Sequence, residues 1–195
     1  MPASATNLLV GPGNLHLGDF GATEPLDTAV ASALDAEDWP DLGGTDGGVT
    51  VTAAREYVRL RMDQTVESPG RRLTGLDVTL ATNLAEPTLE NWATALSDAA
   101  SAITIGGTGA TGYAAMDIGG PAEPGEEPTY HAVIFRGRAP QGRRRLVIAR
   151  KVLSIEEVES EYKKDEQTFI PVTFGAHWVS TSIKSVHVVD ERPIP

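Results

Sequence analysis

An alternation of apolar and polar residues with a period of two runs through the chain from Val49 onward. It occurs in residues 57–63, 76–82, 130–138, 145–153, 168–178 and 183–189. This period is that of a strand with one buried face, because successive side chains of a strand point to opposite sides. Turns rich in Gly, Pro and Asp separate the segments, and a short strand pair is expected at 8–10 and 14–18. The pattern therefore predicts a mainly β protein, an antiparallel two-sheet β-sandwich or barrel.

One segment departs from this period and indicates a single flanking α-helix over about residues 88–100. Its apolar residues are spaced i, i+3, i+4 and i+7, which is the stripe of an amphipathic helix; they are Leu89, Trp92, Ala93 and Leu96. Pro87 suits the first turn, and Glu90 complements the helix dipole there. We expect this helix to lie against a sheet.

The size and composition fit one domain over residues 1–195 with a C-terminal arm at 190–195. The chain has 195 residues, 41% of them hydrophobic, which is enough to build a core and argues against wholesale disorder. It contains no cysteine, so disulfides and thiolate chemistry are excluded. The start of the sequence does not resemble a signal peptide, and no apolar run reaches the roughly 18 residues of a membrane helix. We therefore expect no membrane partner.

Negative charge is concentrated in the first quarter of the chain. The formal net charge is −11, and residues 1–54 hold eight acidic residues with no Lys or Arg. Most of these acids lie in the Asp-, Gly- and Ala-rich segment 19–48, where a helical turn is expected only around Thr28 to Leu34. Long loops of this kind are usually functional, so we interpret 19–48 as an acidic interaction loop. The net charge disfavours stable binding of nucleic acid.

The densest basic patch is expected at a hairpin turn. Arg143, Arg144 and Arg145 follow Gln141-Gly142, and Arg136 and Arg138 lie on the strand paired with them. A solvated turn, a nucleic-acid contact and a docking patch for an acidic surface are all compatible with this pattern. The last alternative would suit head-to-tail self-association, because the chain carries an acidic surface of its own.

No motif indicates an enzyme. The string IGGTGATG holds a formal G-x-G-x-x-G, but a helix precedes it and no helix can follow it, so a loop or hairpin turn is the better interpretation. The four histidines lie on different predicted segments without metal-ligand spacing, and no serine-nucleophile motif occurs. We predict no catalytic residue, no metal site and no cofactor.

Three stretches of the chain resemble the major tail tube proteins of long-tailed, siphovirus-like bacteriophages. In residues 39–65, Leu42-Gly43, Gly48-Val49 and Asp63-Gln64 match a loop that leads into a strand. The matches in residues 76–96 fall on a strand and the helix after it; they are Leu84, Glu86, Thr88, Trp92 and Leu96. The matches in residues 161–178 fall on a strand pair; they are Tyr162, Gln167, Ile170-Pro171-Val172, Phe174 and Ala176. The loops at 106–112 and 119–128 depart from the family pattern.

The resemblance implies a structural virion protein that self-assembles into stacked hexameric rings. These form the tail tube, through which the genome is ejected into the host. Its partners would be further copies of itself and the other tail proteins (tape measure, tail terminator and tail tip), with assembly in the host bacterial cytoplasm. DNA would be only a transient passenger, since an acidic wall repels phosphates. The alternative is a monomeric β-sandwich binding module, such as a virion decoration or host-surface adhesin.

Under the tail tube hypothesis, the contacts between subunits or rings would come from the acidic loop, the basic turn and the segment 155–166. The composition of 155–166 fits a helix, but Val158 and Tyr162 also fit a strand that enters a turn. The candidate interface residues are Asp35, Asp38, Asp41, Asp46, Arg143, Arg144, Arg145, Glu156 and Glu157.

Overall fold

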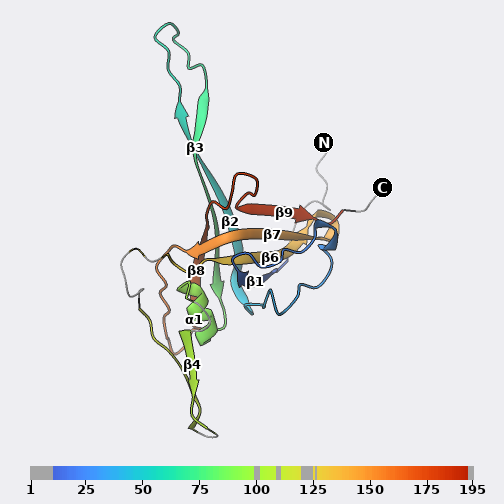
Figure 1. The fold of residues 1–195 in the computed structure, drawn as a ribbon, viewed down its shortest axis with the longest axis vertical. Helices are drawn as coiled ribbons and strands as arrows, with labels where there is room; N and C mark the ends of the chain where they lie inside the picture. Colours follow the sequence, from blue (N-terminus) through green and yellow to red (C-terminus); the bar gives the residue numbers. More distant parts are fainter. Residues whose placement is uncertain (1–10, 99–101, 109–110, 120–124, 126, 193–195) are drawn as a thin grey trace.

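The computed structural model describes residues 11–98, 102–108, 111–119, 125 and 127–192, and it is mainly β and antiparallel, as predicted. Its elements in chain order are β1 (Asn14–Asp19), the 3-10 turn Asp27–Ala29, β2 (Thr45–Arg59), β3 (Arg71–Leu84), α1 (Leu89–Ala95), β4 (Ile103–Gly106), β5 (Tyr113–Met116), β6 (His131–Ala139), the 3-10 turn Pro140–Gly142, β7 (Arg143–Ser154), β8 (Ile170–Ala176) and β9 (Val186–Asp190). A large sheet, a small sheet and one helix make up the fold (Figure 1).

The large sheet has seven strands in the order β1-β6-β7-β8-β3-β2, with β9 also paired to β7. The long strand β7 is shared, because β9 pairs with Arg145–Ala149 and β8 pairs with Val152–Ser154. All strand pairs are antiparallel, and β4 and β5 form a separate two-stranded sheet. The predicted alternation at 130–138, 145–153 and 168–178 therefore falls on the central strands.

The segment just before β2 brings the two edges of the large sheet together. Asp41 forms a β-bridge with His16 of β1, and the N–H of Leu42 donates to the carbonyl of Leu15 at 2.9 Å. A few residues later the same backbone enters β2, the strand at the opposite edge of the sheet. The fold is thus closed in the manner of a barrel at this end, which removes part of the edge-strand liability.

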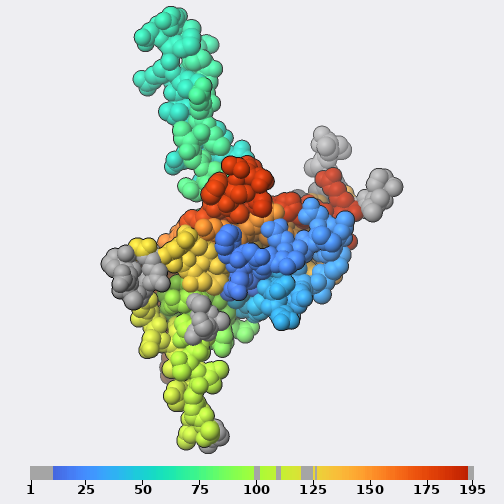
Figure 2. Space-filling model, in the orientation of Figure 1, coloured from blue at the N-terminus to red at the C-terminus, as the bar shows by residue number. Residues whose placement is uncertain are grey.

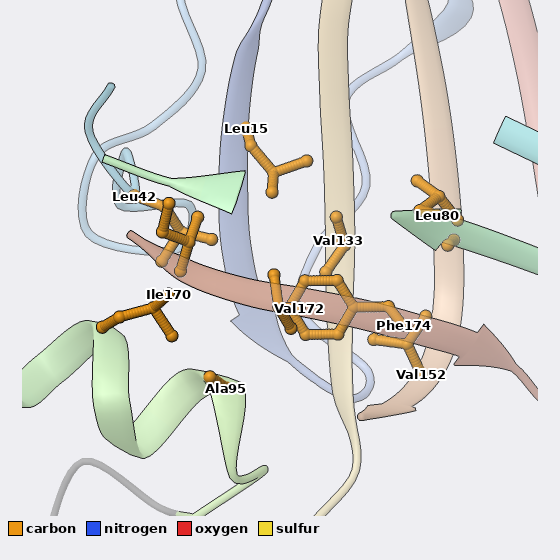
Figure 3. Packing of buried hydrophobic residues seen from close by; sticks show 11 residues of the cluster. Leu15, Leu42, Leu80, Ala95, Val133, Val152, Ile170, Val172 and Phe174 are labelled. Carbon is orange, nitrogen blue, oxygen red and sulfur yellow. The ribbon is translucent and has the colours of Figure 1, made fainter. Parts of the chain in front are cut away.

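Both faces of the sheet are covered, because neighbouring residues of β6 contribute to two different cores. Val133 belongs to the larger core, which includes fully buried Phe174 and Ile170 and which α1 reaches through Ala95 (Figure 3). Ile134 belongs to a smaller core on the other face. Burial of each fully buried side chain of this size contributes about 1.5–3 kcal/mol to the free energy of folding.

The acidic segment 19–48 covers this smaller core. Val30 and Trp39 are almost completely buried, and the Nε1–H of Trp39 donates to the carbonyl of Thr23 at 2.9 Å. A Cβ added to Gly18 would lie 2.9 Å from the Trp39 ring, so the loop packs directly on β1. The helical turn expected around Thr28 to Leu34 begins earlier and is shorter, a 3-10 turn at Asp27–Ala29. The segment is therefore a packed layer of the domain, and its last residues belong to β2.

Helix α1 is shorter than the predicted range 88–100. Thr88 caps it, with its side-chain oxygen accepting from the N–H of Asn91 at 3.2 Å. The helix ends because Ser97 adopts a left-handed conformation with φ of 58°. The hydroxyl of Ser97 accepts from the N–H of Ser154 at 2.7 Å, which ties this end to β7. Residues 99 and 100 lie outside the described residues.

Other sequence predictions need correction. The segment 57–63 is not a half-buried strand: β2 ends at Arg59, and residues 57–59 are exposed on both faces. The segment 14–18 pairs with β6, while 8–10 lies outside the described residues. The range 183–189 becomes a strand only from Val186 onward. Residues 155–169 form neither helix nor strand, and the tip of the predicted C-terminal arm, 193–195, is not described.

Two hairpins project from the body in opposite directions (Figures 1 and 2). The outer part of β2 and β3 forms one of them, because β3 pairs with β8 only from Val78 to Leu84. We call residues 54–77 the projecting hairpin. The small sheet β4–β5 forms the second. The glycine-rich string expected as a loop or hairpin turn falls between these two strands, and its residues 109 and 110 lie outside the described residues.

Candidate functional site

The projecting hairpin is a two-stranded structure without a supporting third strand. Arg71 lies seven residues beyond Val78, so the paired strands extend about 23 Å past the body at 3.3 Å per residue. An isolated two-stranded hairpin is marginally stable in water. This extension therefore has less support from the rest of the domain than the strands of the body have.

One face of the hairpin continues the large core outward without any cover. The register places Val51 opposite buried Leu80, Arg55 opposite Leu76, and Tyr57 opposite Leu73. Leu80 is 1% exposed, whereas Leu76, Tyr57 and Leu73 are each about half exposed (49%, 50% and 53%). Burying the exposed half of each of these three side chains would stabilise a contact by roughly 1 kcal/mol per side chain. The face is thus a strip of unused hydrophobic surface on an extended arm.

Positive charge gathers on the outer part of the same hairpin. Arg59 lies directly opposite Arg71, and Arg72 is next to it. Residues 57–74 hold four arginines and two carboxylates. Within the described residues, none of these arginines forms an ion pair. Like charges placed opposite each other across two strands are destabilising, so this arrangement costs the hairpin stability.

Negative charge gathers around a cavity on the body, between the end of β1, residues 37–42 and α1. The cavity has a volume of about 420 Å³. Six carboxylates line it, and no Lys or Arg does; they are Asp19, Glu37, Asp38, Asp41, Glu90 and Asp98. Within the part of the chain that the structure describes, none of the six forms an ion pair. The residues that line the cavity therefore carry negative charge without a positive counter-charge among them.

His131 also lines this cavity, and it is buried without hydrogen bonds. Its side chain is 4% exposed, and among the described residues neither ring nitrogen has a hydrogen-bond partner. It lies opposite Asp19 in the β1–β6 register. Burial lowers the pKa of His131, and the Asp19 carboxylate opposes this, as do the carbonyl groups of Asp98 and Ser97 and the Asp98 carboxylate. Burial and the nearby carboxylates thus act on the pKa of this ring in opposite directions, and burial is the larger effect.

The structure separates the four acidic residues that the sequence suggested for the interface. Asp38 and Asp41 line the acidic cavity. Asp35 is used within its own loop, where its carboxylate accepts from the N–H of Glu37 at 3.0 Å. Asp46 is exposed at the start of β2, opposite Asn83. The carboxylate of Asp41 also accepts from the side-chain amide of Asn14 at 2.9 Å and from the N–H of Gly43 at 3.0 Å, so Asp41, like Asp35, is used within the chain.

The basic turn lies where the sequence placed it, but its arginines largely bind this same chain. Arg145 makes a two-pronged contact with Asp190, with nitrogen–oxygen distances of 2.6 and 2.8 Å. The side chain of Arg144 donates to the carbonyl of Ala31, and so does that of Arg136 at 3.0 Å. These contacts hold segment 19–48 and β9 to the sheet. Arg143 is half-buried beside them.

The last two suggested residues, Glu156 and Glu157, lie exposed in the irregular segment 155–169. The carboxylate of Glu156 accepts from the hydroxyl of Thr173 at 2.6 Å, which holds the start of the segment to β8. The interface prediction for Glu157 rests on its exposure alone.

Sequence reasoning missed the arginines of the hairpin and the group formed by Asp19, Asp98 and His131. The hairpin arginines were available as a signal, since Arg59 and Arg61 alternate with apolar residues. Their pairing with Arg71 and Arg72 depends on register, which the alternation alone does not define. Asp19 and Asp98 are far apart in the chain, and only the fold brings them to one cavity.

Within the described residues, no three His, Asp or Glu side chains converge closely enough to hold a metal ion. No helix in the described ranges has the length and apolar character to cross a membrane. The comparisons add no identification: no family model matches the chain. No curated protein matches it either.

Proposed function

We propose that this chain is a structural subunit that self-assembles through its projecting hairpin. The observation that carries the proposal is the uncovered apolar strip of Tyr57, Leu73 and Leu76, which continues the core face beyond the body. A second copy is a suitable cover, because a sheet face of one subunit can pack against a sheet face of another. The resemblance to tail tube proteins agrees with this, and we infer stacked hexameric rings that form a phage tail tube.

Several features of the described chain support an assembly role. The large sheet is closed at one end only, and the outer edge of β2 carries no partner strand among the described residues. Open strand edges and apolar strips favour association with further chains. The two hairpins point in opposite directions, which suits contacts with a copy on either side (Figure 2). The acidic surface suits a conduit that DNA passes without binding.

The decisive test combines sedimentation velocity with negative-stain microscopy of the purified chain over a range of concentrations. We expect rings or tubes for the natural sequence. Leu73→Glu should abolish them, because a carboxylate would be buried in the contact. The variant should unfold at the same denaturant concentration as the natural monomer, since Leu73 is 53% exposed.

Thr52→Glu is the matched control, because Thr52 is exposed on the paired strand β2 and on the opposite face of the sheet, across from Thr79. It adds the same charge and should leave the assemblies intact. A natural chain that stays monomeric at all concentrations would contradict the proposal and favour the monomeric binding module. Assembly of Leu73→Glu at the natural level would exclude the apolar strip as the contact.

A further inference from the structure

We propose that the acidic cavity beside α1 is a binding site for a guanidinium group, supplied by a projecting-hairpin arginine of a second copy. The cavity is lined by six carboxylates and by His131, whose ring nitrogens make no hydrogen bonds within the described residues. The identity of the site does not depend on assembly, whereas the second copy as the source rests on the proposed function.

The composition of the cavity selects the class of ligand. Six carboxylates without a basic lining residue favour a cation, and they are too dispersed to bring three ligands to one metal ion among the described residues. A planar guanidinium with five donors can satisfy several acceptors at once, which a compact metal ion cannot do at these spacings. His131, whose ring nitrogens make no hydrogen bond among the described residues, forms part of the wall of the cavity beside these carboxylates.

The hairpin supplies a complementary group. Arg59 and Arg71 face each other across the strands and have no ion-pair partner in the described chain. An external carboxylate cluster would relieve their mutual repulsion. Exposed Arg144, by contrast, already donates to Ala31 within the chain. Other cations without an ion-pair partner among the described residues, such as Arg138 and Lys184, lie outside the projecting hairpin. Of the two hairpins that extend from the body, the one formed by β2 and β3 carries the arginines.

The geometry requires that donor and acceptor come from different copies. The hairpin extends from the body on the side opposite α1, so its tip cannot reach the cavity of its own chain (Figure 1). A contact between two different surfaces of the same molecule is head-to-tail, and repeating it produces a ring or a filament. The proposal therefore specifies which surfaces meet.

The first experiment tests the cavity alone. The protein is titrated with methylguanidinium chloride, and the ring resonances of its four histidines are followed by NMR. If the natural chain assembles, the titration uses the Leu73→Glu variant. We expect a saturable shift at His131 with a Kd on the order of 1 mM. Methylurea, a neutral molecule of the same shape, should leave His131 unshifted at equal concentration. The double variant Asp19→Asn/Asp98→Asn should lose the response, and Asp117→Asn, exposed and outside the cavity, should keep it. No shift at His131 would overturn the site.

The second experiment tests the source by a double-mutant cycle on assembly of the full chain. Asp98→Asn and Arg71→Gln should each raise the concentration needed for assembly at least about fivefold, equal to roughly 1 kcal/mol. The double variant should be no worse than either single variant. Additive effects would overturn the hairpin arginine as the occupant. A natural chain that does not assemble would contradict the proposed function and this occupant, while the titration would still decide the cavity.

Discussion

The acidic segment 19–48 can be tested as a structural layer through Trp39. This residue is 3% exposed, it belongs to the same buried cluster as Val30, Ile134 and Ile148, and its ring N–H donates to the carbonyl of Thr23. Removing a buried Trp side chain costs 3–5 kcal/mol when the space cannot collapse. Trp39→Ala should therefore lower the free energy of unfolding by about 3–5 kcal/mol, and the lost hydrogen bond lies within that range.

The assay is urea unfolding followed by circular dichroism at pH 7.5, with the slope m compared between variants. A detached interaction loop would tolerate Trp39→Ala with a change below about 0.5 kcal/mol, as exposed positions do. Such a result, with m unchanged, would refute the packed-layer interpretation. Gly18→Ala is an independent check, because its Cβ would lie 2.9 Å from the Trp39 ring and should cost about 1–3 kcal/mol.

Three further predictions concern single contacts. Ser97→Ala should lower the free energy of unfolding in urea by about 1–2 kcal/mol, because the partly buried N–H of Ser154 loses its acceptor. An unchanged unfolding midpoint would contradict this. Burial lowers the pKa of His131, so the unfolded state binds a proton at this ring more tightly than the folded state does. The free energy of unfolding should therefore fall as the pH drops below 6.5, by at most about 1.4 kcal/mol per pH unit. His131→Phe should flatten that part of the curve. Asp190→Asn should lower the free energy of unfolding by about 0.5–1 kcal/mol at pH 7. Because the hydrogen bond from Arg145 lowers the pKa of Asp190, the difference in unfolding free energy between this variant and the natural chain should shrink as the pH falls below 3.8.

The periodicity was sufficient to predict the central strands and the presence of a helix. At β8 the alternation and the burial agree from Ile170 to Phe174. At β6 the alternation predicted one buried face, whereas residues 131–134 are all buried because both faces of this strand are covered. At 57–63 the same alternation misled, since a period of two records only that the two faces differ. The alternation does not indicate whether the apolar face is covered by this chain or by another.

The helix end and the candidate site show a second limit. The apolar stripe continued through Leu96, yet a left-handed Ser97 ends α1 so that its hydroxyl can bind the N–H of Ser154. That contact joins residues 57 positions apart, and no local pattern contains it. Asp38 and Asp41 were found from local charge density, whereas His131 belongs to the cavity only because β6 lies beside β1.

The pairing of β3 with β8 has a mechanical consequence. Seven residue pairs, from Val78–Ala176 to Leu84–Ile170, hold the base of the projecting hairpin in the body. Hydrogen bonds between antiparallel strands run perpendicular to the chain. A pull along the hairpin therefore loads all of these bonds together in shear, so none can break first as in a zipper. A tensile load on the hairpin tip would be resisted until the whole strand slips. The base of the hairpin can therefore transmit force between the body and a molecule bound at the tip.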